Sequence, residues 1–189
     1  MGRFRLTRRG VELRLDAAEA EMLRQLLTEL TELLGPVDGP PAADSAARDP
    51  LEAMVGMADP ASPPPELPVD PVLARLLPDG YRDDPVAAAE LRRYTEPELR
   101  REKLAAAKAV LAALPATGGR LTLDTAAAGC WLGALNDLRL ALGTRLEVTE
   151  DTYAELDRLP EDSPQAAALG IFAWLGWLQE TLVAALARG

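Results

Sequence analysis

The sequence contains no histidine, a single cysteine and few aromatic residues, and each shortage excludes a class of protein. Without histidine, the chain lacks the commonest general base at neutral pH and the commonest metal ligand. One cysteine, Cys130, cannot close a disulfide within the chain, so nothing in the sequence indicates an oxidising compartment. Zinc-site spacings, glycine-rich phosphate loops and nucleophile-elbow motifs are also missing from the sequence. We therefore expect no metal, no cofactor and no enzymatic activity.

Aromatic residues make up 4% of the 189-residue chain, whereas hydrophobic residues make up 48%. Alanine and leucine supply much of the hydrophobic fraction and enter helices at little cost, whereas strands favour β-branched and aromatic residues. No uncharged run reaches the roughly 18 residues that a membrane helix needs. Residues 166–188 come closest, but Glu180 interrupts them. The sequence predicts a mainly α-helical protein with a sizeable core, located in the cytoplasm and not in a membrane.

The N-terminal third combines a predicted hairpin, a helix and a proline-rich loop. Residues 3–15 alternate apolar and polar side chains, which predicts a β-hairpin that turns at Arg8-Arg9-Gly10. Asp16 and Glu19 have the spacing of a capping box, and they begin a helix that ends at Gly35. Residues 36–68 are rich in proline, and we expect a flexible loop with one short helix from Leu51 to Met57.

The rest of the chain predicts further helices, most of which begin with a residue type that favours a helix N-terminus. Their expected ranges are 71–77, 85–94, 95–114, 124–143, 150–159 and 163–187. The total is seven or eight helices. We therefore predict one domain over residues 1–189, an irregular, orthogonal helical bundle with an N-terminal β-hairpin.

The helix predicted at 124–143 is apolar on almost every side, so we expect it to be the centre of the fold. One face carries the bulky residues Trp131, Leu135, Leu138 and Leu142. Another carries Cys130, Gly133, Ala134, Asp137 and Ala141, whose small members favour a tight packing seam with a second helix. In the alternative interpretation, Cys130 is a redox-responsive thiol, which would need a nearby cation or helix N-terminus to lower its pKa.

Polar residues interrupt this apolar helix at Asn136, Asp137 and Arg139, and Arg145 follows near its end. A buried charge needs a partner, so we predict a structural polar network in which Asp137 pairs with Arg145, Arg75 or Arg82. A catalytic carboxylate that acts on an anionic substrate is a further alternative. No second acidic residue stands at a spacing that would define acid and base roles.

Positive charge is concentrated at the start of a chain whose net charge is −10. Residues 1–15 carry five arginines against Glu12 alone, a charge of +4, so the remainder carries −14. These arginines are candidate contacts for a partner protein or for nucleic acid, although the overall negative charge repels nucleic acid. The candidates are Arg3, Arg5, Arg8, Arg9 and Arg14.

A second group of basic residues lies between 92 and 108, interleaved with glutamates, which favours a solvated face of helix salt bridges. Its members are Arg92, Arg93, Arg100, Arg101, Lys103 and Lys108. Trp177 lies roughly opposite the apolar stripe of the last predicted helix. It indicates either a contact with the hairpin or a subunit interface, and we favour the interface of a homodimer.

Four segments carry a resemblance to a known family. They are DPVLARLLPDGYRDD (70–84), ELRRYTEPELR (90–100), WLGALNDLRLALGTRL (131–146) and WLGWLQETLV (174–183). They resemble an actinobacterial family, domain of unknown function twenty-seventeen, over nearly the whole chain. The resemblance implies a small cytoplasmic protein with no assigned catalytic activity, often encoded beside the adaptor of the Clp protease.

Some members of that family are described as oxidative-stress transcription regulators that sense through paired cysteines. Because Cys130 is alone, only an intermolecular disulfide or a single-thiol modification would remain for this chain. Our leading hypothesis is a non-enzymatic regulatory or interaction protein, related to transcription, that acts through protein contacts or the basic hairpin. The alternatives are an adaptor or structural partner in Clp-type proteolysis and, last, an enzyme that acts on an anionic substrate.

Overall fold

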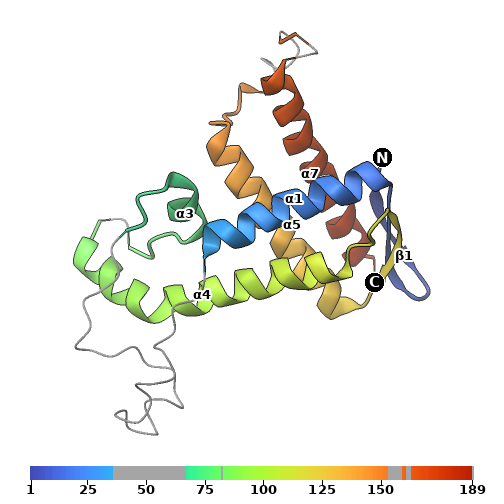
Figure 1. Cartoon of the computed structure of the whole chain (residues 1–189). Helices are drawn as coiled ribbons and strands as arrows, with labels where there is room; N and C mark the ends of the chain where they lie inside the picture. Colours follow the sequence, from blue (N-terminus) through green and yellow to red (C-terminus); the bar gives the residue numbers. More distant parts are fainter. Residues whose placement is uncertain (36–66, 82, 153–158, 161–162, 189) are drawn as a thin grey trace, which may run out of the picture.

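The structure is a computed structural model that describes residues 1–35, 67–81, 83–152, 159–160 and 163–188. Its elements are, in chain order, β1 (Arg3–Thr7), β2 (Gly10–Leu15), α1 (Ala17–Leu34), α3 (Pro71–Leu76), α4 (Pro85–Ala113), β3 (Gly119–Leu123), α5 (Thr125–Arg145) and α7 (Pro164–Leu186). Figure 1 shows the three strands together at one end of the helices, close to both chain termini. The mainly helical class is confirmed.

The described residues form five helices and not the predicted seven or eight. The helix predicted at 51–57, nearly all of the loop predicted at 36–68 and most of the helix predicted at 150–159 lie outside the described residues. The number of helices is also lower than predicted because the helices expected at 85–94 and 95–114 are one continuous helix, α4.

Helix α4 continues past Thr95, where the sequence analysis placed a boundary, and through Pro97. Thr95 was expected to cap a new helix, but its hydroxyl donates to the carbonyl of Leu91 at 2.9 Å, which keeps it inside the existing one. Across the proline, Arg100 and Glu96 form a partly buried ion pair of 2.7 Å. Proline removes one backbone hydrogen bond from the helix. The side-chain contacts of Thr95 and Arg100, together with the packing of the helix on both sides of the proline, offset the stability that is lost.

The predicted hairpin is present, but it is part of a larger sheet. Strands β1 and β2 pair antiparallel, and Gly10 has the positive φ of 121° that the turn requires. Strand β3 also pairs antiparallel with β2, so the strand order is β1-β2-β3. A lone hairpin is only marginally stable in water, whereas three strands that bury one apolar face can form a stable sheet.

The sequence analysis predicted no element between the helices at 95–114 and 124–143 and so missed β3. Gly118 has a φ of 79°, and a Cβ there would lie 2.6 Å from the carbonyl carbon of Asp16. Only glycine therefore allows the chain to pass the start of α1 and enter the sheet at β3. The capping box of Asp16 and Glu19, by contrast, is confirmed at that same helix start.

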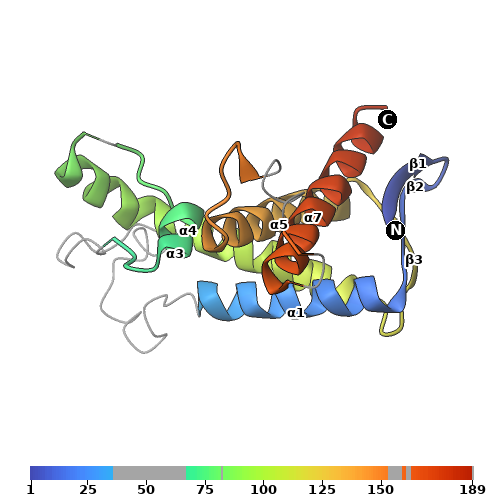
Figure 2. The ribbon, with the colours of Figure 1, turned by 90° about the horizontal axis from the view of Figure 1, so that it is seen from above.

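Helix α5 lies at the centre of the molecule, as predicted, with α3, α4 and α7 packed against it (Figures 1 and 2). Its bulky face is buried at Trp131, Leu135 and Leu138, and the Trp131 ring meets Phe4 of β1 edge-on at 5.6 Å. The predicted seam of small residues is wrong at Gly133, which is exposed, with no atom within 4 Å of an added Cβ. The rest of that face is covered, with Ala134 buried and Cys130 and Ala141 partly buried against the core.

Helix α7 is long and apolar enough to cross a membrane by length and composition alone. A core helix passes the same test, so this observation is weak evidence. Leu175, Leu178 and Leu182 of α7 have no exposed surface and belong to the same hydrophobic core as the inner face of the sheet. These three side chains fit the packing of a core helix.

Candidate interaction site on the basic face of the sheet

The sheet has an apolar face toward the helices and a polar face away from them. Strand pairing sets the polar side chains in two rows that cross all three strands. The first row is Arg3, Arg14 and Arg120, and the second is Arg5, Glu12 and Thr122. We call these six residues the basic face. It unites three of the five predicted arginines with Arg120, which the sequence analysis did not consider.

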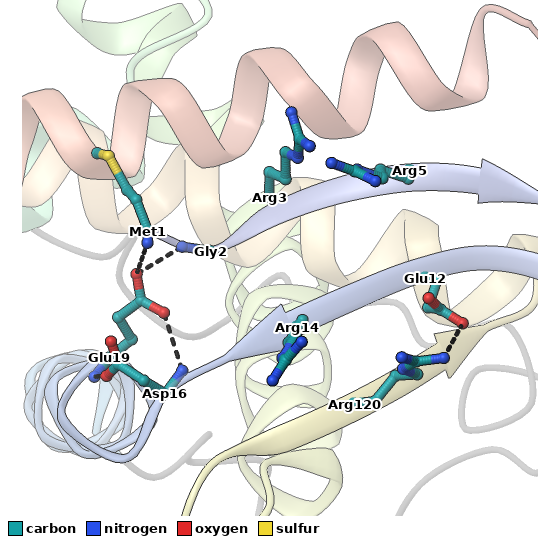
Figure 3. A pocket seen from close by; sticks show the side chains of 9 residues that line it. All are labelled: Met1, Gly2, Arg3, Arg5, Glu12, Arg14, Asp16, Glu19 and Arg120. Carbon is teal, nitrogen blue, oxygen red and sulfur yellow. Dashed lines mark hydrogen bonds and ion pairs between the residues drawn. The ribbon is translucent and has the colours of Figure 1, made fainter.

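The basic face borders an open hollow of about 320 Å³, shown in Figure 3. The residues that line the hollow are Met1, Gly2, Arg3, Arg5, Glu12, Arg14, Asp16, Glu19 and Arg120. Figure 3 shows Glu12 beside Arg120 at one end and the carboxylate of Glu19 at the other. Arg14 lies between them on β2.

The positive charge of the basic face is largely uncompensated. Arg120 approaches Glu12 at 3.5 Å, but both side chains are partly exposed, so this pair contributes little to stability. Within the described part of the chain, Arg3, Arg5 and Arg14 form no ion pair with any carboxylate. Four arginines against one glutamate leave three net positive charges on one small surface.

This arrangement works against the stability of the sheet. Like charges that lie directly opposite each other on neighbouring strands cost a few tenths to about 1 kcal/mol per pair. The register places Arg3 opposite Arg14 and Arg14 opposite Arg120, so the first row contains two such pairs. A local rule broken in this way is typical of a binding surface, because the repulsion is relieved when an anion binds.

The two acidic residues at the other end of the hollow have structural roles. The Asp16 side chain accepts from the amide of Glu19 at 2.8 Å, and Glu19 accepts from the amide of Asp16 at 2.9 Å. Glu19 also accepts from the amide of Gly2 at 2.5 Å. Because these carboxylates cap α1 and tie down the N-terminus, the arginines remain the part of the hollow that can bind a ligand.

The remaining two predicted arginines lie elsewhere. Arg8 and Arg9 form the exposed turn between β1 and β2 and do not line the hollow. Arg120 was missed with its strand, although the sequence held a signal for it. Between Gly119 and Asp124, polar Arg120 and Thr122 alternate with apolar leucines, the period of a strand with one buried face.

Five of the six basic residues in the second group, on α4, have acidic partners, and the exposed Lys108 has none within the described residues. Arg92 pairs with Asp79, Arg93 with Glu90 at 3.2 Å, and Arg101 with Glu98. Lys103 pairs with a residue of α5, as described next, and Arg100 is held by Glu96. These residues form a network of ion pairs and not a second basic patch.

Asp137 is only 3% exposed, and its partner is not one of the predicted arginines. Lys103 of α4 donates to its Oδ1 from 2.6 Å. Burial raises the pKa of the Asp137 carboxyl above its ordinary value of 3.8, while the hydrogen bond and charge of Lys103 partly offset the rise. The pair links α4 to α5 inside the bundle.

Only part of the predicted network of Asn136, Asp137, Arg139 and Arg145 is present: a hydrogen bond from the Asn136 side chain helps to lower the pKa of Asp137. Asn136 is exposed, while Arg139 donates to Gln179 at 2.7 Å and lies 5.4 Å above the ring of Phe172. Arg145 approaches Glu29 of α1 at 3.6 Å. Eight residues along a helix correspond to about 12 Å, too far for Arg145 to reach Asp137.

Cys130 is a free, partly buried cysteine that packs against the core. Its reactivity stays a prediction. Trp177 is 42% exposed, and its indole N–H donates to the carbonyl of Gly2 at 3.2 Å. The contact with the hairpin, which we considered the less favoured explanation for Trp177, is therefore present. The homodimer interface stays a prediction.

Comparison with known proteins now gives the family. The profile described as "Domain of unknown function (DUF2017)" matches residues 1–186. The chain belongs to this family. It is 38% identical to the "Oxidative stress regulator AosR" of Mycobacterium tuberculosis over 95% of the chain and 84% of that protein. It is 37% identical to the "Putative oxidative stress regulator AosR" of Mycobacterium leprae over 89% of the chain and 78% of that protein.

No solved structure matches this DUF2017 chain. The names of its relatives suggest a regulatory role, which agrees with the leading hypothesis from the sequence. In the described part of the chain, no group of three or more histidine, cysteine or acidic residues is placed to hold a metal ion. The basic face is the candidate functional site of this chain.

Proposed function

We propose that this DUF2017 protein is a non-enzymatic, cytoplasmic regulator of transcription that binds a negatively charged partner through its basic face. The row of Arg3, Arg14 and Arg120 is the observation behind this proposal. Its like charges lower the stability of the sheet, and within the described residues only Arg120 has a carboxylate partner, Glu12. The relatives named oxidative stress regulators support the regulatory part. Their names also suggest peroxide as the condition for a test.

The test replaces the four arginines of the basic face by glutamine, as R3Q/R5Q/R14Q/R120Q, in a host strain that lacks the native gene. We expect the native protein to restore the transcript changes caused by peroxide and the variant to fail. A matched control removes four exposed arginines outside the sheet, Arg75, Arg101, Arg145 and Arg188. It changes the net charge equally, and it should behave like the native protein.

Both variants are first compared with the native protein by circular dichroism and urea unfolding, so that loss of fold is separated from loss of binding. If the basic-face variant restores the transcript response fully, the basic face is not the regulatory surface. If the control variant fails to the same degree, the response depends on total charge and not on this site, which also contradicts the proposal.

A further inference from the structure

The two outer strands of the sheet differ in what covers their free edges. At β1, the amide of Phe4 donates to the hydroxyl of Thr181 at 3.2 Å, and the carbonyl of Gly2 accepts from Trp177. Both partners belong to α7, so this helix lies along the edge of β1. At β3, no side chain of the described residues bonds to a backbone group of the strand.

Strand register identifies which backbone groups of β3 point outward. Thr7 and Gly10 flank the two-residue turn, so this pair exchanges both of its hydrogen bonds. The bonded pairs then recur at every second residue of β2, and the residues between them, such as Leu13, direct their backbone groups toward β3. The outward amide of Phe4 agrees with this alternation.

Leu13 pairs with Leu121 and Val11 with Leu123, so these leucines of β3 bond back to β2. The N–H and C=O groups of Arg120 and Thr122 therefore point away from the sheet. Both residues are exposed, and Leu121 between them is half-buried, whereas its pairing partner Leu13 is fully buried. The edge thus presents two free pairs of backbone groups beside an incompletely covered apolar side chain.

We propose that an extended segment of a partner protein pairs with the edge of β3, with acidic side chains alternating with apolar ones. This inference rests on the proposed function and specifies its partner. Alternate side chains of an added strand point to the same face of the sheet. On the outer face they lie beside Arg120, with Arg14 in the next strand, and glutamate or aspartate complements both. On the inner face an apolar side chain covers Leu121.

Strand addition gives the binding both strength and selectivity. The backbone groups of Arg120 and Thr122 supply up to four hydrogen bonds, which extended segments of many sequences can make. The unbalanced charge of the basic face then selects acidic segments, and it excludes basic ones by repulsion. Nucleic acid, which cannot pair with a strand edge, uses only the second of these features.

The experiment uses three fluorescent peptides of roughly eight residues, a usual strand length, and the full-length protein. The first alternates glutamate and valine, the second has the same composition in two blocks, and the third alternates lysine and valine. We expect the first to bind at least about tenfold more tightly than the others by fluorescence polarisation. Amide hydrogen exchange at Arg120 and Thr122 should slow when it is bound.

Two substitutions test the edge directly. Thr122→Pro removes an outward amide without removing a bond to β2, and it should weaken binding of the first peptide about tenfold. Thr122→Ala is its matched control and should bind like the native protein. Arg120→Glu should reverse the preference between the glutamate and lysine peptides.

Equal binding of the glutamate–valine peptide to T122P and the native protein would overturn pairing at β3, as would unchanged exchange at Arg120 and Thr122. Failure of all three peptides to bind would overturn it too, and so would binding to a DNA duplex in their place with steep salt dependence. Each of these outcomes leaves the proposed function intact. That function fails if R3Q/R5Q/R14Q/R120Q restores the transcript response, or if the control variant fails to the same degree.

Discussion

The covered edge at β1 and the open edge at β3 belong to one small sheet, yet they meet different surroundings. Phe4 of β1 is buried against Trp131, and its amide is bonded to Thr181 of α7. Arg120 and Thr122 of β3 are exposed, with backbone groups directed away from the sheet. Proteins commonly cover or charge their sheet edges to prevent unwanted pairing. Here α7 covers the edge of β1, while the edge of β3 has no side-chain cover from the described residues.

The comparison teaches that the helices stabilise the sheet from one side and leave the other side for binding. In the middle of the sheet, Leu13 is fully buried, and its neighbours in the row are Phe4 and Leu121. In this row burial falls from Phe4 to Leu121, whereas in the neighbouring row Leu6 of β1 is 41% exposed and Leu123 of β3 is only 3% exposed. The following predictions test this asymmetry.

The largest effect is expected at the buried end of this row. Phe4→Ala should lower the free energy of unfolding by about 3–5 kcal/mol, because it removes a buried ring and its contact with Trp131. Leu121→Ala, at the other end of the row, should cost less than half of that, since Leu121 is half-buried. Urea unfolding followed by circular dichroism measures both. Equal losses would show that the two edges are held alike.

A smaller effect is expected from the hydrogen bond that covers β1. Thr181→Val keeps the shape of the side chain but leaves the amide of Phe4 without its acceptor, so the free energy of unfolding should fall by about 1–3 kcal/mol. Amide exchange at Phe4 should become faster. Thr122→Val, a similar replacement at the open edge, serves as the control and should leave stability nearly unchanged.

The third prediction concerns the arginine row and has the opposite sign. Arg14→Thr removes the central charge between Arg3 and Arg120, so it should raise the free energy of unfolding by a few tenths to about 1 kcal/mol. The gain should shrink in high salt, which screens exposed charges. A loss of stability at every salt concentration would mean that Arg14 is a structural residue and not a binding one.

The smallest effect is expected for proline at the open edge. Thr122→Pro should change the free energy of unfolding by no more than about 0.5 kcal/mol, because the amide it removes bonds to nothing in the described structure. Leu121→Pro, one residue earlier, removes an amide that pairs with β2 and should destabilise far more. If Thr122→Pro and Leu121→Pro lower the free energy of unfolding equally, the amide of Thr122 does not point away from the sheet.

Much of the secondary structure followed from local patterns in the sequence. The hairpin was readable from its period of two, and the start of α1 from Asp16 and Glu19. Strand β3 has the same period of two. The role of Gly118 just before it could not be read from the sequence, because glycine is needed there to avoid the backbone of Asp16, which is remote in sequence. The candidate site was thus predicted at Arg3, Arg5 and Arg14, while the alternating pattern around Arg120 was overlooked.

Partners of buried charges were the least predictable feature. The sequence indicated that Asp137 needs a cation, but several basic residues met that condition equally well. The packing of α4 against α5 brings Lys103 to Asp137, while Arg145 points to Glu29 of α1. A requirement for a partner is a property of one residue, whereas its identity depends on how two helices cross.

The sequence by itself determined the helical class, the apolar character of the central helix and the concentration of arginine near the N-terminus, because each depends on composition or short-range spacing. The tertiary structure decided which strand joins the hairpin, which edge α7 covers, and that the arginines of three strands form one face. Those outcomes depend on contacts between residues far apart in the chain, such as Phe4 with Thr181 and Arg14 with Arg120.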